Sequence, residues 1–347
     1  MEVSLKIQDL KRWLSLFDKI TGTIEPETRR VELFYKNGLW FKASDNCAVL
    51  RIFVGESPPF EGARTISLDL LKAFTSDVKG DELRLSIQEN LVVLKAGNEL
   101  LSTKTSKISV EEREENEEYV CTVVKKDFEN ALNFASSNLE EGAFTGIIFE
   151  DEMVTMYGAY EEILTISFLS TNLFKAFAKK IPYATARHVY KFLERLNVQT
   201  IDVYTKGELL SLRYPFLELD VCGDALEETE REQLSRLLQE KPLEVLHAKK
   251  EIVSRLIRKA AYLGKNTKAT LVRDGETMKI TFRGPHVLYS AEFFVRAGKD
   301  FQVIFSPKRL RGALSRMKGE NLVFELTSSH LRIANPSKTQ MILLKID

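Results

Sequence analysis

One short unit occurs three times along this chain, and it limits the folds that the chain can adopt. Its clearest copy is Phe305–Ile333, FSPKRLRGALSRMKGENLVFELTSSHLRI. Ser306 and Pro307 are typical of a helix start, and Gly319 is typical of a helix end. Between them the apolar residues have helical spacing, and after Gly319 they alternate, which is the period of a strand. The copy therefore predicts a basic helix packed on a β-hairpin, with the apolar stripe Leu310, Ala313, Leu314 and Met317.

The second copy is Ser67–Val93, in which Thr75 interrupts the stripe and Leu71, Phe74 and Val78 continue it. A third stripe is formed by Val189, Phe192, Leu193 and Leu196, and an apolar strand follows it at Ile201 and Val203. Repeats at a regular interval indicate homologous units. The sequence therefore predicts three homologous domains, at residues 1–115, 116–230 and 231–347.

Each domain also has a first half that begins with an amphipathic helix, expected at 5–22, 124–139 and 248–263. The strands expected after these helices are 31–35, 39–43 and 49–54; 146–149, 153–157 and 163–169; and 270–273, 278–282 and 290–295. Strands joined by short turns must be antiparallel, because parallel pairs need long crossovers. The expected class is α+β, with each domain a duplicated helix-plus-antiparallel-strands unit.

The connectors between domains are acidic. Glu111–Glu118 holds six Glu and one Arg, and Asp224–Glu232 holds five acids and one Arg. Such charge runs are typical of solvated surface segments. Four leucines at and after the second run predict an additional helix there: Leu226, Leu234, Leu237 and Leu238.

Cysteine content and hydropathy point to a cytoplasmic protein. Cys47, Cys121 and Cys222 contain no CxxC pair, and they are expected to be free thiols in a reducing compartment. The N-terminal residues lack the apolar block of a signal peptide, and no apolar run reaches the length of a membrane span. A soluble cytoplasmic protein with no membrane partner is expected.

The charge is distributed unevenly between helices and the rest of the chain. The formal net charge is zero, but six helical segments carry 23 bases and 8 acids when they are taken as 4–22, 67–80, 124–139, 186–197, 248–268 and 306–319. The helices therefore have a net charge of +15, which the remaining residues balance. A one-sided basic surface on an otherwise acidic protein attracts phosphates at that surface. A solubilising role for these bases is the alternative, but it would leave acids equally frequent on the helices.

Enzymatic readings find little support. The four histidines, His188, His247, His286 and His330, are scattered without metal-ligand spacing, and no phosphate-binding loop or nucleophile motif follows a strand. Acids near turns, at Asp45 and Glu150–Glu152, are typical of solvated surface. The expectation is a non-enzyme without cofactor or metal. A metal-dependent nuclease and an open scaffold for protein partners remain as alternatives, separable by cleavage assays and by the oligomeric state.

The order and spacing of these units resemble the bacterial DNA sliding clamp, the beta subunit of DNA polymerase III. The resemblance covers the whole chain, and its most specific parts are Leu310–Ile333 and Glu276–Thr281. It implies a head-to-tail homodimer that closes into a ring around duplex DNA, with helices lining the hole and sheets outside. It also implies a role as a processivity factor in DNA replication. The implied partners are the replicative DNA polymerase, a clamp loader and other proteins that carry short clamp-binding motifs.

The resemblance and the charge pattern together predict contacts to the DNA backbone, which carry no direct sequence information. The expected DNA-binding residues lie on the six helices: Lys11, Arg12, Lys72, Arg187, Lys191, Arg195, Arg255, Arg258, Lys259, Lys308, Arg309 and Arg316.

The family also has a hydrophobic pocket for partner peptides between its second and third domains. The matching residues are Phe144, Tyr160, Ile163, Pro242, Val245, Met341, Leu343 and Leu344, which core packing explains equally well. Two segments depart from the family pattern, Ala159–Ile163 and Leu343–Ile346, and the family's Phe-Pro-Asp-Tyr segment before the third domain is absent. An accessory or virus-borne clamp that serves repair or another polymerase is the alternative function.

A three-domain arc must leave unmatched strand edges at its two ends. We therefore expect the homodimer contact to join an edge near Leu100 and Leu101 to an edge near Ile280 and Phe282.

Overall fold

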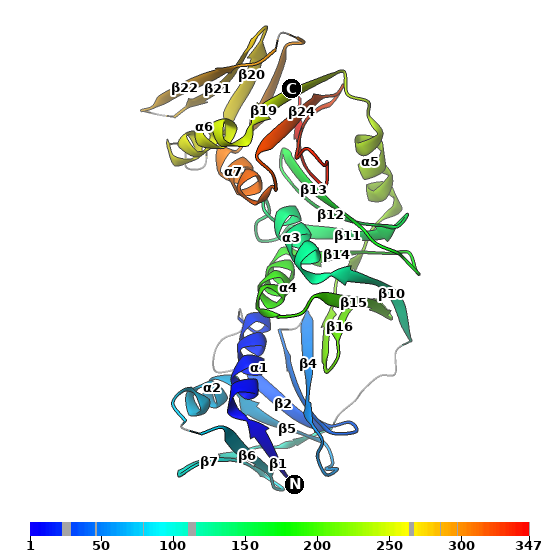
Figure 1. The fold of residues 1–347 in the computed structure, drawn as a ribbon, viewed down its shortest axis with the longest axis vertical. Helices are drawn as coiled ribbons and strands as arrows, with labels where there is room; N and C mark the ends of the chain where they lie inside the picture. The colour runs from blue at the N-terminus through cyan, green and yellow to red at the C-terminus, as the bar shows by residue number, and fades with distance from the viewer. Residues whose placement is uncertain are drawn as a thin grey trace. The chain divides into compact units, whose positions relative to one another are not determined.

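The computed structural model describes residues 1–22, 29–45, 47–78, 80–109, 116–263, 267–284, 286–296 and 298–346 (Figure 1). The described residues form seven α-helices and 26 β-strands, and every strand pairing among them is antiparallel. The predicted α+β class with antiparallel sheets is confirmed. Of the acidic run Glu111–Glu118, residues 111–115 lie outside the described residues.

One order of elements, a strand, a helix and three strands, occurs six times, as the duplicated units predict. The first half-repeat is β1 (Glu2–Lys6), α1 (Ile7–Ile20), β2 (Arg30–Tyr35), β3 (Leu39–Ser44) and β4 (Ala48–Gly55). The second is β5 (Ala63–Ser67), α2 (Leu68–Ser76), β6 (Glu82–Ile87), β7 (Leu91–Ala96) and β8 (Glu99–Lys104). The third is β10 (Glu117–Val124), α3 (Lys125–Ala135), β11 (Phe144–Glu150), β12 (Met153–Tyr160) and β13 (Ile163–Ser170).

The fourth half-repeat is β14 (Phe177–Pro182), α4 (Tyr183–Arg195), β15 (Thr200–Lys206), β16 (Leu209–Tyr214) and β17 (Leu217–Val221). The fifth is β19 (Glu244–Lys249), α6 (Lys250–Leu263), β20 (Ala269–Asp274), β21 (Thr277–Arg283) and β22 (Leu288–Phe294). The sixth is β23 (Phe301–Phe305), α7 (Pro307–Arg316), β24 (Asn321–Leu326), β25 (His330–Ala334) and β26 (Gln340–Lys345). Three further elements lie outside this order: β9 (Lys107–Ile108), β18 (Asp224–Ala225) and α5 (Glu228–Gln239), the predicted additional helix.

The chain divides into two compact units: residues 1–125 with 188–223, and residues 126–187 with 224–347. This division does not follow the borders at 115 and 230, so the three-domain organisation stays a prediction. Unit 1 contains a four-stranded sheet, β1-β6-β7-β8, and a nine-stranded sheet, β10-β15-β16-β17-β4-β3-β2-β5-β9. Unit 2 contains a nine-stranded sheet, β18-β14-β11-β12-β13-β26-β25-β24-β19, and a four-stranded sheet, β22-β21-β20-β23.

The helices bury the stripes that the sequence shows. In α1, Leu10, Leu14 and Phe17 are at most 1% exposed, and in α7 the same is true of Leu310 and Leu314. Ser306 is the N-cap of α7 and proline occupies its first turn, as predicted. Burial of these apolar surfaces holds each helix on its sheets.

Strands of different half-repeats pair within each nine-stranded sheet, and the two sheets follow the same pairing rule. In unit 1, β4, the last strand of the first half-repeat, pairs with β17, the last strand of the fourth. In unit 2, β13 ends the third half-repeat and pairs with β26, which ends the sixth. Each seam therefore joins the last strands of two half-repeats that are three apart.

A disulfide strengthens the seam of unit 1. Cys47 and Cys222 lie at the ends of β4 and β17, and they are bonded to each other. The expectation of three free thiols is therefore wrong for two of them, and Cys121 is buried and does not take part in the disulfide. A separation of 175 residues in sequence hides this pairing, which the strand register creates.

Candidate functional site

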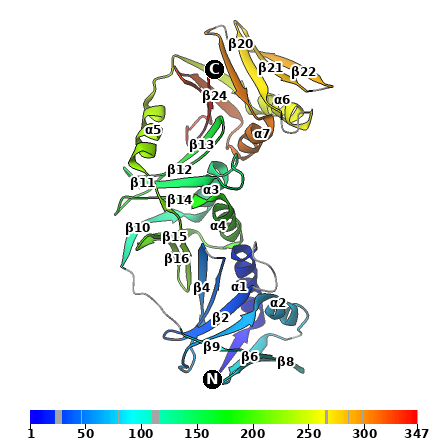
Figure 2. The same cartoon turned by 180° about the vertical axis from the view of Figure 1, so that it is seen from behind.

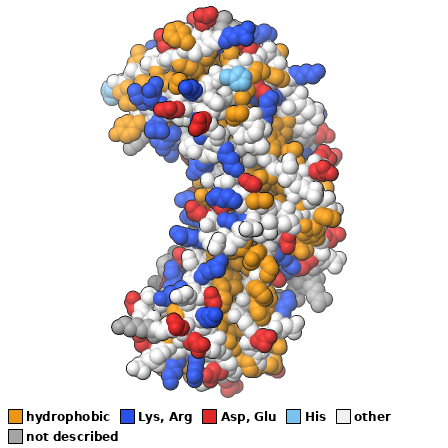
Figure 3. All heavy atoms as spheres, in the orientation of Figure 1, with side chains coloured by type: hydrophobic (Ala, Val, Ile, Leu, Met, Phe, Trp, Pro, Cys, Tyr) orange, Lys and Arg blue, Asp and Glu red, His pale blue; other side chains and the backbone are white. Residues whose placement is uncertain are grey.

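Most of the predicted DNA-binding side chains reach solvent from the helices. Those of Lys72, Lys191 and Arg309 are partly covered, and the remaining nine are exposed. In unit 2, Lys and Arg side chains gather over α6 and α7 in the space-filling view (Figure 3). The helices hold these side chains outward because their apolar stripes occupy the opposite side.

Several of these cations are bound to their own chain. The Nζ of Lys72 lies 2.8 Å from Oδ1 of Asp18, and Lys11 donates to the Ser76 carbonyl over 3.1 Å. Arg316 donates through Nε to Oδ1 of Asn133 at 2.8 Å. These contacts compete with binding to phosphate, so these side chains are weaker candidates.

Arg309 is the most restrained of the set. Its guanidinium lies over the Tyr160 ring, donates to the Asn138 carbonyl at 3.0 Å and lies 3.3 Å from Glu140. Its side chain is 12% exposed. Arg309 therefore fixes α7 to the neighbouring loops of unit 2 instead of projecting freely.

The remaining predicted cations are available for an external anion. Eight of their side chains form no hydrogen bond or ion pair with any described residue: Arg12, Arg187, Lys191, Arg195, Arg255, Arg258, Lys259 and Lys308. Such unpaired cations on helix surfaces are suited to salt-dependent contacts with a phosphate backbone.

The eight residues predicted for a partner pocket do not line one pocket. Ile163 pairs with Leu344 across the β13–β26 seam, and both side chains are at most 1% exposed in the core with α7. Met341 and Leu343 belong to a different cluster. Neighbouring residues of a strand point to opposite faces of the sheet, which explains the separation. The other four are more accessible: Phe144 and Val245 are 40% and 45% exposed, Pro242 is exposed and Tyr160 is partly covered.

Helix α5 covers the face of the sheet on which Met341 and Leu343 lie. Leu234 is 7% exposed and packs with Met341 and Leu343, and Leu237 and Leu238 join the same cluster. Both views show α5 on the side of the sheet away from α7 (Figures 1 and 2). Ion pairs hold the helix in place, Lys180 with Glu230 at 2.9 Å and Arg231 with Glu150 at 2.6 Å.

Of the two strand edges predicted for the subunit contact, one lies on a terminal strand of its sheet and the other does not. Leu100 and Leu101 lie on β8, the terminal strand of its sheet, and Leu100 is 64% exposed. Ile280 and Phe282 lie on β21, which is flanked by β20 and β22, and they are 1% and 2% exposed. The expectation that these two residues lie on a sheet edge is wrong, because β21 is internal and the terminal strands of this sheet are β22 and β23.

The terminal strand β22 exposes large apolar side chains. Leu288 is 63% exposed and Phe294 is 85% exposed, whereas single exposed apolar residues are ordinary. A sheet edge with unpaired backbone groups and exposed apolar side chains is typical of a strand that pairs with another chain.

One histidine and two of the acids near turns have structural contacts. Nδ1 of His188 and Oδ2 of Asp45 lie 2.8 Å apart, and both side chains are about 5% exposed. Glu150 is the partner of Arg231. No group of three or more His, Cys, Asp or Glu residues in the described parts of the chain is placed to hold a metal ion.

Six half-repeats, helices backed by antiparallel sheets and sheets shared between half-repeats define the DNA-clamp fold. The solved structures that the chain matches over its full length include sliding clamps of bacterial DNA polymerase III. The beta subunit of Pseudomonas aeruginosa has a TM-score of 0.82 at 13% identity, and 100% of both chains is covered. That of Streptococcus pyogenes has a TM-score of 0.83 at 13% identity, again with 100% of both chains covered.

The sliding clamp of Caulobacter crescentus has a TM-score of 0.82 at 13% identity, with 100% of this chain and 99% of that chain covered. No family model matches the sequence, and no curated protein matches it. The resemblance seen in the sequence is therefore confirmed at the level of the fold. Among the described residues no helix is long and apolar enough to cross a membrane.

Proposed function

We propose that this chain is a DNA sliding clamp, a homodimeric ring that encircles duplex DNA and tethers a polymerase. The strand pairing carries this proposal. The last strands of the first and fourth half-repeats pair, and so do those of the third and sixth. The strand that ends the fifth, β22, and the strand that ends the second, β8, are both terminal in their sheets. The same rule pairs β22 of one copy with β8 of the next.

That contact is heterologous, because its two sides are different surfaces, and two such contacts close a dimer. The internal seams are antiparallel, so we expect the contact between copies to be antiparallel as well. The unpaired cations of α1, α4, α6 and α7 are then proposed to face the DNA backbone. Contacts with phosphates exchange readily, which permits movement along the duplex without sequence preference.

The proposed role is non-catalytic, and the proposed location is the cytoplasm, where bacterial DNA is found. Because two of the three cysteines form a disulfide, the cysteines no longer support a reducing compartment. The proposed location therefore rests on the proposed function. Proposed protein partners are the replicative polymerase, a clamp loader and proteins with short clamp-binding motifs.

The test is retention on DNA of different topology. The protein is loaded on closed circular DNA and on the same DNA after linearisation, and the bound fraction is followed over time at moderately raised salt. An enclosing ring stays on the circle and slides off the free ends of the linear molecule. Equal retention on both DNAs excludes enclosure. A monomer at micromolar concentration by light scattering excludes a self-assembled ring.

A further inference from the structure

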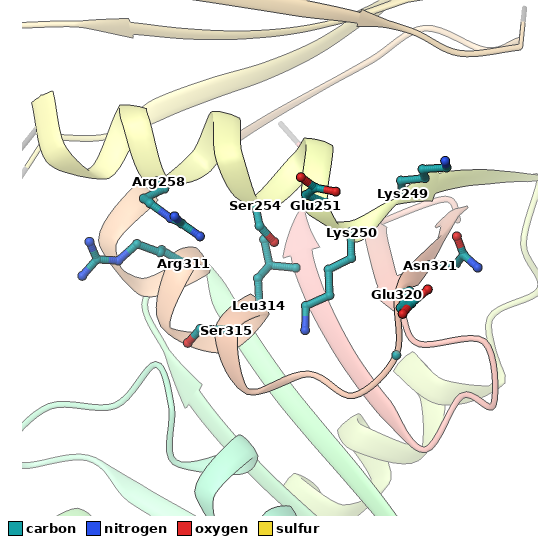
Figure 4. A pocket seen from close by; sticks show the side chains of 11 residues that line it. Lys249, Lys250, Glu251, Ser254, Arg258, Arg311, Leu314, Ser315, Glu320 and Asn321 are labelled. Atoms are coloured by element: carbon teal, nitrogen blue, oxygen red, sulfur yellow. The ribbon is translucent and has the colours of Figure 1, made fainter.

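A groove of about 780 Å³ lies between α6 and α7 in unit 2 (Figure 4). Its floor and walls come from the first turns of α6, the second half of α7 and the turn that leads into β24. Two small polar residues, Ser254 of α6 and Ser315 of α7, are part of this lining, and Leu314 of α7 lies between them (Figure 4).

The lining is rich in cations. Lys249, Lys250, Arg258 and Arg311 line the groove with two acids, Glu251 and Glu320, which leaves an excess of two positive charges. Among the described residues, no acid forms an ion pair with Arg258 or Arg311. Both side chains lie at the same end of the groove, away from Glu320 (Figure 4). Two guanidinium groups at one end of a groove without a carboxylate are suited to bind an anion.

Two further polar groups in the groove are affected by burial, and one of them has no hydrogen-bond partner. The hydroxyl oxygen of Ser254 is buried and has no hydrogen-bond partner, which is uncommon in folded proteins. The ammonium of Lys250 donates to the Met317 carbonyl, and desolvation lowers the pKa of this amine. A bound anion would accept a hydrogen bond from the hydroxyl and would stabilise the charged form of the amine.

We propose that this groove is a binding site for a phosphate group, held by the guanidinium groups of Arg258 and Arg311 and by the Ser254 hydroxyl. Guanidinium forks bind phosphate oxygens with two parallel hydrogen bonds, and the hydroxyl supplies a third donor. The phosphate group comes either from the DNA backbone or from a soluble phosphate compound. The DNA source rests on the proposed clamp function, whereas the soluble source does not require a ring.

The experiment measures binding of inorganic pyrophosphate and of a short DNA duplex to the full chain by isothermal titration calorimetry. The test variants are Arg311→Gln and Arg258→Gln, which remove one charge each from exposed side chains. Arg283→Gln is the matched control, because Arg283 is an exposed residue of β21 in the same unit and does not line the groove. Thermal unfolding of each variant establishes that it is folded.

Saturable binding of at least one probe is expected for the wild-type protein and the control. Each test variant should bind that probe at least about tenfold more weakly, the loss expected for one charge-assisted hydrogen bond. Pyrophosphate that displaces the duplex identifies a contact to the DNA backbone; pyrophosphate that binds without displacing it identifies a site for soluble phosphates. If neither probe is weakened by Arg311→Gln or Arg258→Gln, there is no phosphate site in the groove. Topological retention on circular DNA is measured separately, so the clamp function stands or falls on its own result.

Discussion

The guanidinium carbon of Arg309 lies 4.0 Å from the centroid of the Tyr160 ring. The sequence predicts one of these residues for the DNA and the other for a partner pocket, but in the structure they bind each other. Cation–π contacts of this kind stabilise packing when they are shielded from solvent. A basic residue on a predicted helix is therefore not by itself evidence for an external ligand.

Replacing Arg309 by Gln should lower the stability of unit 2 by about 1–2 kcal/mol, because the cation–π contact and a charged hydrogen bond are lost. Thermal unfolding measures this loss. Arg255→Gln is the control, since Arg255 is exposed and has no such contacts. Equal unfolding temperatures for the two variants would contradict a structural role for Arg309.

The exposed cations of α6 should determine the salt dependence of duplex binding. Arg255→Gln and Lys259→Gln should each reduce the log–log slope of affinity against salt by about 0.9 if each side chain contacts one phosphate. Direct binding to a short duplex over a range of salt concentrations gives the slope. Lys72→Gln, which breaks an internal ion pair, should change the slope less. The prediction is wrong if Lys72→Gln has the larger effect on the slope.

Leu288→Lys should dissociate the dimer, because it places a charge on the exposed edge strand β22. Light scattering at micromolar concentration should show a monomer that remains folded. Ile252→Lys is the control, since Ile252 is 37% exposed on α6, outside that edge. A dimeric Leu288→Lys protein would move the subunit contact elsewhere.

The ion pair between Arg51 and Asp220 crosses the β4–β17 seam at 2.5 Å. Burial raises the pKa of Asp220. The Ser211 hydrogen bond and the Arg51 charge together lower this pKa by a larger amount, so it lies below its ordinary 3.8. A carboxyl with a depressed folded pKa stabilises the protein above the unfolded pKa, and this contribution is lost as the pH falls through the folded pKa. Wild-type stability should therefore decrease below pH 3.8 more steeply than that of Asp220→Asn.

At neutral pH, Asp220→Asn should cost about 3 kcal/mol, because the partly buried Arg51 loses its counter-charge. Lys206 also lies 3.6 Å from Asp220, and it is left without that carboxylate as well. Denaturant unfolding at several pH values tests both expectations. Parallel stability curves for the two proteins at all pH values would show that the carboxylate contributes no pH dependence.

The disulfide should stabilise unit 1 by about 2–4 kcal/mol, mainly because it constrains the unfolded chain. The double variant Cys47→Ser/Cys222→Ser should unfold at lower denaturant concentration than the wild type. Reductant should lower the midpoint of the wild type and leave the double variant unchanged. A midpoint that is insensitive to reductant in both proteins would mean that the bond is not formed in solution.

Much of the fold can be predicted from the sequence, because most helices and strands bury one face and expose the other. The helical stripes and the alternating strands 31–35, 153–157 and 278–282 match α1, β2, β12 and β21 and their neighbours. The first strand of every half-repeat is missed. In the first, Glu2–Lys6 leads into α1 without an intervening turn, so its residues read as part of the helix.

The candidate binding sites are harder to predict from the sequence, because they depend on which residues come together in space. Leu343 and Leu344 are neighbours on β26, and the alternation of a strand assigns them to opposite faces. We predict no strand there from the sequence, so the sequence-based expectation does not separate these pocket residues. Nothing in the sequence joins Cys47 to Cys222, or places Arg311 beside Ser254, since those contacts follow from strand register and helix packing.

The strands β8 and β22, each of which has one unpaired edge, also create a risk of open-ended assembly. Because they are unlike surfaces, a copy that binds through one still presents the other, and each addition regenerates the same binding end. If two copies fail to close on each other, growth continues head to tail as an open filament. Crowded or partly unfolded preparations should therefore form fibres, and substitutions that weaken β22 should make the protein more soluble.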